Sequence, residues 1–334
     1  MVEKSPYPAR FPSGVVIGKH TVTTTSNEFD IAVILSGVLI PDLRRAIALP
    51  PFRILLAFGL VGLVYLLGGS AAIALGASAN PYGWAAQITR AFVAATTVAV
   101  LLLVDTRVER LRVKDLGFEP RSLPQLAGGL LVGVAMVAVV IAIEVLKRWY
   151  RVEGLAVPVG RIPLLAGSMV LAFLLGAVFQ ESLFRGILFR GLESWLGSWS
   201  ALVISSLLFG LFQALQPHAT VVSSLASAIG GGALLGAAYM ATRNLWLAIG
   251  LHAGIDFVLV GVYGWSPGAH LFQSSTEGPA LWTGGAFGLN FGAVYLLVAA
   301  LVTLLLLVDA VRRGYVVPFR GRAESGFETT QLDS

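Results

Sequence analysis

The chain has 334 residues, of which 56% are hydrophobic and only 12% are charged. A soluble domain carries about 25% charged residues, so this composition excludes an ordinary soluble globule, and it also excludes a disordered chain, which needs high charge and low hydrophobicity. The formal net charge is +5 and there is no cysteine, which excludes disulfides, zinc–thiolate sites and a cysteine nucleophile. The apolar residues come in blocks and the basic residues lie between them, so the sequence predicts an all-α polytopic membrane protein without a nucleic-acid partner.

The N-terminal part of the chain, residues 1–50, is expected to form a polar tail. Residues 1–30 are rich in Ser, Thr and Pro and lack the basic, then apolar, then small pattern of a cleaved signal peptide. Ile31–Pro41 is apolar but shorter than the ~20 residues that a membrane span requires, so we expect it to lie at the interface.

Eight apolar segments then predict a transmembrane helical domain over residues 51–310, followed by a C-terminal tail over 311–334. Two charged residues, Arg90 and Glu144, fall near span ends, where Arg can extend its head group to the interface. Small residues at Gly230 to Gly232 in the sixth segment predict close helix packing. The eight segments are Ile54–Leu75, Trp84–Val104, Leu126–Leu146, Ile162–Phe179, Ser194–Gln216, Ala219–Ala241, Leu245–Tyr263 and Leu289–Val308.

The basic residues predict the orientation of these spans. With a cytoplasmic N-terminus, the inner segments hold 18 of the 23 Lys and Arg residues, and the outer loop 147–161 holds four. Because Lys and Arg are enriched in cytoplasmic loops, both termini are expected on the cytoplasmic side. The inner segments are 1–53, 105–125, 180–193, 242–244 and 309–334.

Ionisable side chains inside two of the spans are the first candidates for function. An ionisable residue costs about 2.5–3.5 kcal/mol at the centre of a membrane helix, so it is rarely present without a role. Glu181 and Arg185 are four residues apart at the end of the fourth span and share one helix face. His252 and Asp256 have the same spacing in the seventh span, where the carboxylate could orient the imidazole.

A third polar position, Gln213, follows Phe209 by one helical turn in the fifth span. Each feature also has a structural interpretation: an ion pair at the membrane surface, a buried His–Asp pair, or an interhelical hydrogen bond worth about 1 kcal/mol. Their presence on three separate spans favours one shared polar site inside the bundle.

At these residues the chain resembles the CAAX-protease and bacteriocin-processing (CPBP or Abi) family of intramembrane proteases. That family carries Glu-Glu-x-x-x-Arg, Phe-x-x-x-His and His-x-x-x-Asn or Asp on three different membrane helices. The counterparts here are Gln180-Glu181-x-x-x-Arg185, Phe209-x-x-x-Gln213 and His252-x-x-x-Asp256. The resemblance is strong over about 160–260 and weaker over 105–310.

The resemblance implies an intramembrane endopeptidase that acts on membrane-associated peptides or proteins, with a bacterial inner membrane as the expected location. A glutamate would activate water, while histidines and the Asn or Asp would position that water and stabilise the oxyanion. The implied catalytic residues are Glu181, Arg185, His252 and Asp256, and Phe209 supports the motif. No metal or other cofactor is expected, because the interior offers few ligands and no cysteine.

Two motif positions, Gln180 and Gln213, depart from the family. A glutamine side chain has no proton-accepting carboxylate, so Gln180 cannot be a general base, whereas Gln213 can still donate an N–H to an oxyanion. Glu181, or His252 oriented by Asp256, is then the candidate base. Three hypotheses stay open: an endopeptidase with altered catalytic residues, a pseudoprotease that binds membrane clients, and a transporter whose polar residues line a pathway.

The predicted topology places Glu181 near the inner face and Gln213 toward the outer face. Both can line one cavity only if the fourth helix continues past Phe179 or the fifth begins later.

Overall fold

The computed structural model describes residues 49–75, 82–103, 106, 117–215, 219–264, 270–285 and 288–319. These residues lie in one compact unit, Arg45–Ser334. The expected interfacial segment Ile31–Pro41 and nearly all of the N-terminal tail lie outside the described residues.

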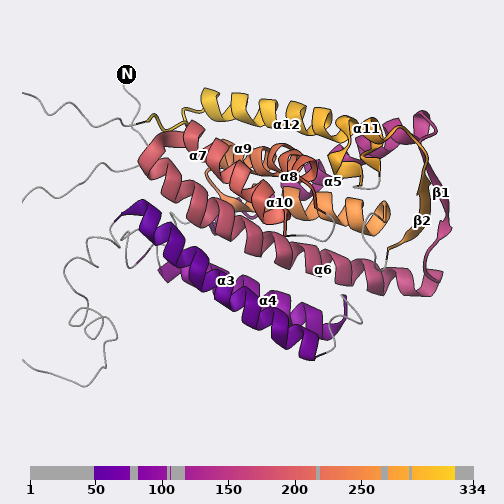
Figure 1. Cartoon of the computed structure of the whole chain (residues 1–334), viewed down its shortest axis with the longest axis horizontal. Helices are drawn as coiled ribbons and strands as arrows, with labels where there is room; N and C mark the ends of the chain where they lie inside the picture. Colours follow the sequence, from indigo (N-terminus) through magenta and orange to yellow (C-terminus); the bar gives the residue numbers. More distant parts are fainter. Residues whose placement is uncertain are drawn as a thin grey trace, which may run out of the picture. The chain divides into compact units, whose positions relative to one another are not determined.

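The described residues form a helical bundle, which confirms the predicted all-α membrane fold (Figure 1). Seven of its helices are long and apolar enough to cross a bilayer. The predicted spans agree with the helices within a few residues. The count of seven is one lower than the eight predicted spans because two of these spans lie in one continuous helical stretch. In chain order the main elements are α3 (Pro50–Ala74), α4 (Trp84–Leu103), α5 (Pro124–Leu146), α6 (Ile162–Glu181), η5 (Ser182–Phe189), α7 (Arg190–Gln213), α8 (Val221–Ser227), η6 (Ala228–Ala233), α9 (Leu234–Thr242), α10 (Leu245–Asp256), η7 (Phe257–Val262), α11 (Ala280–Thr283) and α12 (Ala293–Arg312).

The fourth and fifth predicted spans lie in one helical stretch of 55 residues, Val159–Gln213. The predicted inner loop over 180–193 is therefore wrong: α6 passes directly into the π-helical segment η5, in which every residue is buried. Glu181 and Arg185 form an ion pair within this helix, so their charges do not force the chain out to the surface. The helix thus continues past Phe179, which is one of the two conditions stated above for Glu181 and Gln213 to line one cavity.

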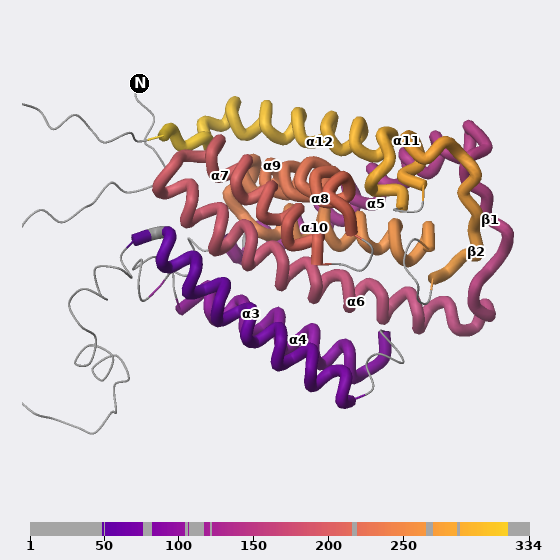
Figure 2. Tube along the Cα trace, in the orientation of Figure 1, coloured from indigo at the N-terminus to yellow at the C-terminus, as the bar shows by residue number. Residues whose placement is uncertain are grey.

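The chain reverses direction inside α7, at Gly197. This residue has φ 77° and ψ 170°, a left-handed conformation that favours glycine, and a Cβ there would collide with the backbone of the segment at Phe319. After the reversal, Phe209 packs against Phe184 with ring centroids 5.1 Å apart. The stretch thus forms two antiparallel passes, and Figure 2 shows α7 at the end of the bundle farthest from the β-strands.

Two interactions hold this end of the bundle. The Ser198 amide donates to the Val317 carbonyl at 2.9 Å, and the Val317 amide donates to Ser198 Oγ at 2.8 Å. Arg243, in the turn between α9 and α10, donates to both carboxylate oxygens of Glu193 at 2.9 and 2.8 Å. Residues 242–244 and the segment after α12, both predicted to lie inside, are therefore at the same end as the Gly197 turn.

A two-stranded ribbon covers the opposite end (Figure 1). Strands β1 (Tyr150–Leu155) and β2 (Phe272–Thr276) are antiparallel, with Tyr150 opposite Thr276. Beneath the ribbon, the Tyr263 hydroxyl donates to the fully buried carboxyl of Glu144 at 3.4 Å. Glu144 is thus enclosed by protein near the end of α5. The sequence did not predict this ribbon.

Helices α5 and α10 pack closely through glycines on both partners. A Cβ at Gly129 or Gly133 of α5, or at Gly250 or Gly254 of α10, would collide with backbone atoms of the facing helix. Contacts of this kind between small residues let membrane helices approach closely. They also fix the position of His252, which lies between the two glycines of α10.

Two adjacent glycines of α5 test this packing. Gly129→Ala is expected to lower the free energy of unfolding by about 1–3 kcal/mol or more, because the methyl group would force the two backbones apart. A Cβ at Gly128 meets nothing within 4 Å, so Gly128→Ala should leave stability unchanged or raise it slightly. Thermal unfolding of both variants in detergent measures the difference, and equal melting temperatures would contradict the close approach of α5 and α10.

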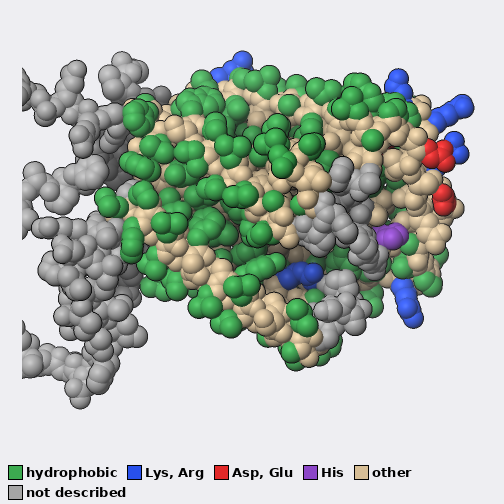
Figure 3. Space-filling view, viewed as in Figure 1, with side chains coloured by type: hydrophobic (Ala, Val, Ile, Leu, Met, Phe, Trp, Pro, Cys, Tyr) green, Lys and Arg blue, Asp and Glu red, His purple; other side chains and the backbone are tan. Residues whose placement is uncertain are grey.

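The surface around the bundle is apolar, as a lipid-facing surface requires. Figure 3 shows hydrophobic side chains over most of one face. Helices α3 and α4 lie side by side (Figure 1) and pack on the α6–η5 part of the long stretch.

Candidate active site

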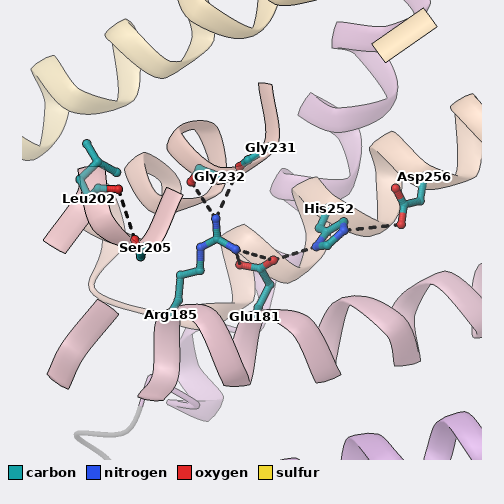
Figure 4. Close-up of polar contacts among 8 residues, drawn as sticks. All are labelled: Glu181, Arg185, Leu202, Ser205, Gly231, Gly232, His252 and Asp256. Atoms are coloured by element: carbon teal, nitrogen blue, oxygen red, sulfur yellow. Dashed lines mark hydrogen bonds and ion pairs between the residues drawn. The ribbon is translucent and has the colours of Figure 1, made fainter. Parts of the chain in front are cut away.

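Four charged or titratable side chains from two spans form a continuous chain of contacts (Figure 4). Arg185 Nη1 lies 3.1 Å from each oxygen of the Glu181 carboxylate. His252 Nδ1 lies 2.7 Å from Glu181 Oε1, and His252 Nε2 lies 3.5 Å from Asp256 Oδ2. The structure therefore joins the two pairs that the sequence predicted into one cluster, Arg185–Glu181–His252–Asp256.

Burial of this cluster decreases along the chain of contacts. The side chains of Glu181, Arg185 and His252 are 0%, 1% and 7% exposed, whereas that of Asp256 is 34% exposed. Asp256 thus connects the interior cluster with the space outside it.

On its other side, Arg185 is held by the backbone of η6. Its Nη2 donates to the Gly232 carbonyl at 2.7 Å and lies 3.5 Å from the Gly231 carbonyl. A Cβ at Gly232 would come within 2.7 Å of Ser206 Cα, so glycine permits η6 to approach α7 here. This acceptor was not predicted, although the triplet Gly230 to Gly232 marks its position in the sequence.

Phe209 of α7 forms an aromatic wall of the cluster. Its ring lies 5.1 Å beneath the Arg185 guanidinium and 6.2 Å from the His252 ring. A cation over an aromatic face is stabilised by the ring quadrupole, and more so away from water. Groups from α6, η5, α7, η6 and α10 therefore meet at one place, but α7 contributes the Phe209 ring and not the polar side chain of Gln213.

The two substituted motif positions stand apart from this network. Among the described residues, neither Gln180 nor Gln213 contributes to the hydrogen bonds and ion pairs of the cluster. The side-chain oxygen of Gln180 is buried and has no hydrogen-bond partner in the described part of the chain. Gln213 is the last residue of α7, one turn beyond Phe209.

The contact distances assign different tasks to the two carboxylates beside His252. With ionised Glu181 as acceptor at 2.7 Å, the imidazole proton belongs on Nδ1, which leaves Nε2 able to accept a proton. This tautomer follows from the hydrogen-bond partners. Glu181 thus makes the closer, orienting contact that the sequence analysis expected from Asp256, and Nε2 faces Asp256 at the exposed side.

Residues 162–258 match the Rce1-like family of type II CAAX prenyl endopeptidases. This Rce1-like region runs from the first residue of α6 into η7 and contains every motif position quoted above. The match confirms the predicted resemblance to CAAX-type proteases over less than a third of the chain. Neither the curated proteins nor the solved structures include a significant match.

The structure was also searched for side chains that could hold a metal ion. Among the described residues, no group of three or more His, Cys, Asp or Glu side chains is arranged to hold a metal ion. The expectation of a metal-free site stays a prediction.

Proposed function

We propose that this integral membrane protein is a CAAX-type intramembrane endopeptidase that hydrolyses peptide bonds of membrane-associated substrates. The observation that carries the proposal is the buried contact between Glu181 Oε1 and His252 Nδ1 at 2.7 Å, which turns Nε2 toward the partly exposed Asp256. A carboxylate that orients an imidazole, and an imidazole nitrogen that can accept a proton, are the parts that general-base hydrolysis requires.

In the proposed mechanism His252 Nε2 removes a proton from a water molecule positioned by Asp256, and the water oxygen attacks the scissile carbonyl carbon. The imidazolium that forms is stabilised by Glu181, whose own charge is compensated by Arg185. His252 then donates the proton to the leaving amine as the C–N bond breaks. Gln213 is the proposed N–H donor to the oxyanion. No step uses a metal ion.

The family match supports a lipid-modified substrate, because the matched family is one of prenyl endopeptidases. We further propose a bacterial inner membrane as the location. Its support is the composition of the spans, which are short and rich in glycine and alanine.

A pseudoprotease that binds membrane clients is the second candidate. The observation in its favour is that both substituted positions, Gln180 and Gln213, lack groups that exchange protons near neutral pH. In addition, Glu181 already contacts both Arg185 and His252, so these two ion pairs form without a substrate.

One experiment distinguishes the endopeptidase from the pseudoprotease. It measures hydrolysis of a quenched prenylated peptide by the purified protein, in detergent and in liposomes. The endopeptidase proposal predicts cleavage by the wild-type protein. If only the double variant Gln180→Glu with Gln213→His cleaves the peptide, the pseudoprotease is the correct alternative. Glu181-dependent ion flux in proteoliposomes without any cleavage would instead indicate a transporter.

A further inference from the structure

Glu144 is a fully buried carboxyl group that the proposed mechanism does not use. One of its oxygens, Oε2, accepts from the Tyr263 hydroxyl at 3.4 Å, whereas Oε1 is buried and has no hydrogen-bond partner in the described part of the chain. The basic residues that follow it in the sequence, Lys147 and Arg148, are exposed. The described residues thus give this carboxyl group no basic partner.

The β1–β2 ribbon above Glu144 has one fully buried side chain, that of Tyr150. The Tyr150 ring stacks on the ring of Tyr263 with centroids 4.6 Å apart. The Tyr263 hydroxyl also lies 3.0 Å from Thr276 Oγ1, and Ser274 Oγ donates to the Tyr263 carbonyl at 2.9 Å. Both strands therefore pack on Tyr263, which is also the hydrogen-bond partner of Glu144.

The outer side of the ribbon adds little to its attachment. Val152 of β1 is 55% exposed. Arg151 and Glu277 are 3.7 Å apart, but both side chains are more than half exposed, and ion pairs of this kind contribute little stability. The stack of Tyr150 on Tyr263 is thus the buried contact of the ribbon, so a change beneath it decides whether the ribbon stays in place.

An ionised carboxylate is disfavoured beneath this stack, because a charge removed from water needs a compensating charge or several hydrogen bonds. Among the described residues, the titratable side chains that face Glu144 are Tyr150 of β1 and Tyr263, directly after η7. Burial raises the pKa of both phenols, so they stay neutral and supply no positive charge. A protonated carboxyl group is neutral and fits the enclosed position.

We propose that Glu144 carries a proton while the ribbon is closed, and that loss of this proton releases the ribbon from the bundle. The carboxyl group gives its proton to water, and the carboxylate that remains is hydrated only when the tyrosine stack moves away. The ribbon is therefore closed at low pH and open at high pH. This switch acts at the end of the helix that carries His252 and Asp256, since η7 continues α10 as far as Tyr263. It is independent of the proposed activity.

The test measures the position of the ribbon in the purified full-length protein as a function of pH. The chain has no cysteine, so spin labels at Val152→Cys in β1 and Leu297→Cys in α12, both exposed positions, report one distance by pulsed electron paramagnetic resonance. We expect one distance at about pH 5 and a longer one that gains population toward about pH 9, the range in which buried carboxyl groups titrate. Glu144→Gln, which is neutral at every pH, should keep the closed distance throughout. Tyr263→Phe, which removes the hydroxyl contacts, should shift the transition to lower pH by about one unit.

Two controls separate Glu144 from other titratable groups of this region. Glu277→Gln removes an exposed carboxylate from the same ribbon, and His270→Gln removes a histidine that lies beside Gly264 and whose charge changes near neutral pH. Both variants should keep the wild-type transition.

A distance that does not change with pH in the otherwise wild-type protein would overturn the inference, and so would a transition that survives Glu144→Gln. Loss of the transition in His270→Gln would also overturn it, because the histidine would then be the group that titrates. If Glu144→Gln does not fold, Tyr263→Phe decides: an unchanged midpoint contradicts the inference, and a midpoint at lower pH supports it.

Discussion

Replacement of His252 by alanine is expected to lower kcat for peptide hydrolysis by about two to four orders of magnitude. The imidazole is the only group in the cluster that combines a buried orienting contact, at 2.7 Å to Glu181, with a nitrogen facing the exposed side. Glu181→Gln should cause a comparable loss, because the amide can present its N–H to Nδ1 and so favour the wrong tautomer. The measurement is kcat for a quenched prenylated peptide, with melting temperature recorded for each variant.

Asp256→Asn is the control for this prediction, because it should lower kcat less than His252→Ala does. Its contact with Nε2 is long, at 3.5 Å, and an amide can still position water, so a smaller fall in kcat is expected. If His252→Ala keeps wild-type kcat while remaining folded, the imidazole is not the base and the proposed mechanism is wrong. If Asp256→Asn is as damaging as His252→Ala, Asp256 has a more direct role than its distance indicates.

Replacement of Arg185 by methionine is expected to lower the free energy of unfolding by about 3–5 kcal/mol. The substitution would leave the carboxylate of Glu181, which is fully buried, without the guanidinium 3.1 Å away. It would also leave the Gly232 carbonyl without its donor. Chemical denaturation in detergent measures the loss.

The double variant Glu181→Gln with Arg185→Met separates charge from packing. It should recover most of the lost stability, because no uncompensated buried charge remains. Arg313→Met is the matched control, since Arg313 has the same four-residue spacing to Asp309 at 2.8 Å but on an exposed surface; no measurable loss is expected. Equal losses for the single and double variants would show that electrostatic coupling in the pair is negligible.

Local sequence patterns predicted much of the fold and part of the candidate site. Apolar segment length predicted the spans, and four-residue spacing predicted that Glu181 would meet Arg185 and that His252 would meet Asp256, as the structure has them. The same reasoning misplaced residues 180–193, because a hydropathy argument assigns charged residues to a loop. The ion pair of Glu181 and Arg185, which the spacing did predict, lets this segment stay inside the bundle as a helix.

The contacts between segments distant in the sequence could not be predicted from such local patterns. Glu181 and His252 are 71 positions apart, and no periodicity in either segment specifies that they meet. The carbonyl of Gly232 carries no side-chain signal at all, so only the glycine triplet marked its position. The β1–β2 ribbon pairs segments more than a hundred residues apart, each short enough to pass for a loop.

The glycine contacts between α5 and α10 have a consequence for how a substrate reaches the cluster. Rotation of α10 about its axis would bring larger side chains than Gly250 and Gly254 to the contact with α5, where they would collide with its backbone. This close packing therefore fixes the direction in which the His252 imidazole points and its position along the helix. We therefore expect His252, the proposed base, to stay in place when a substrate binds. The α3–α4 hairpin, in contrast, packs on α6 through side chains, among them Tyr65 stacked on Phe179, Tyr82 edge-on to Phe173 and the Gln87 amide bonded to the Ser168 carbonyl.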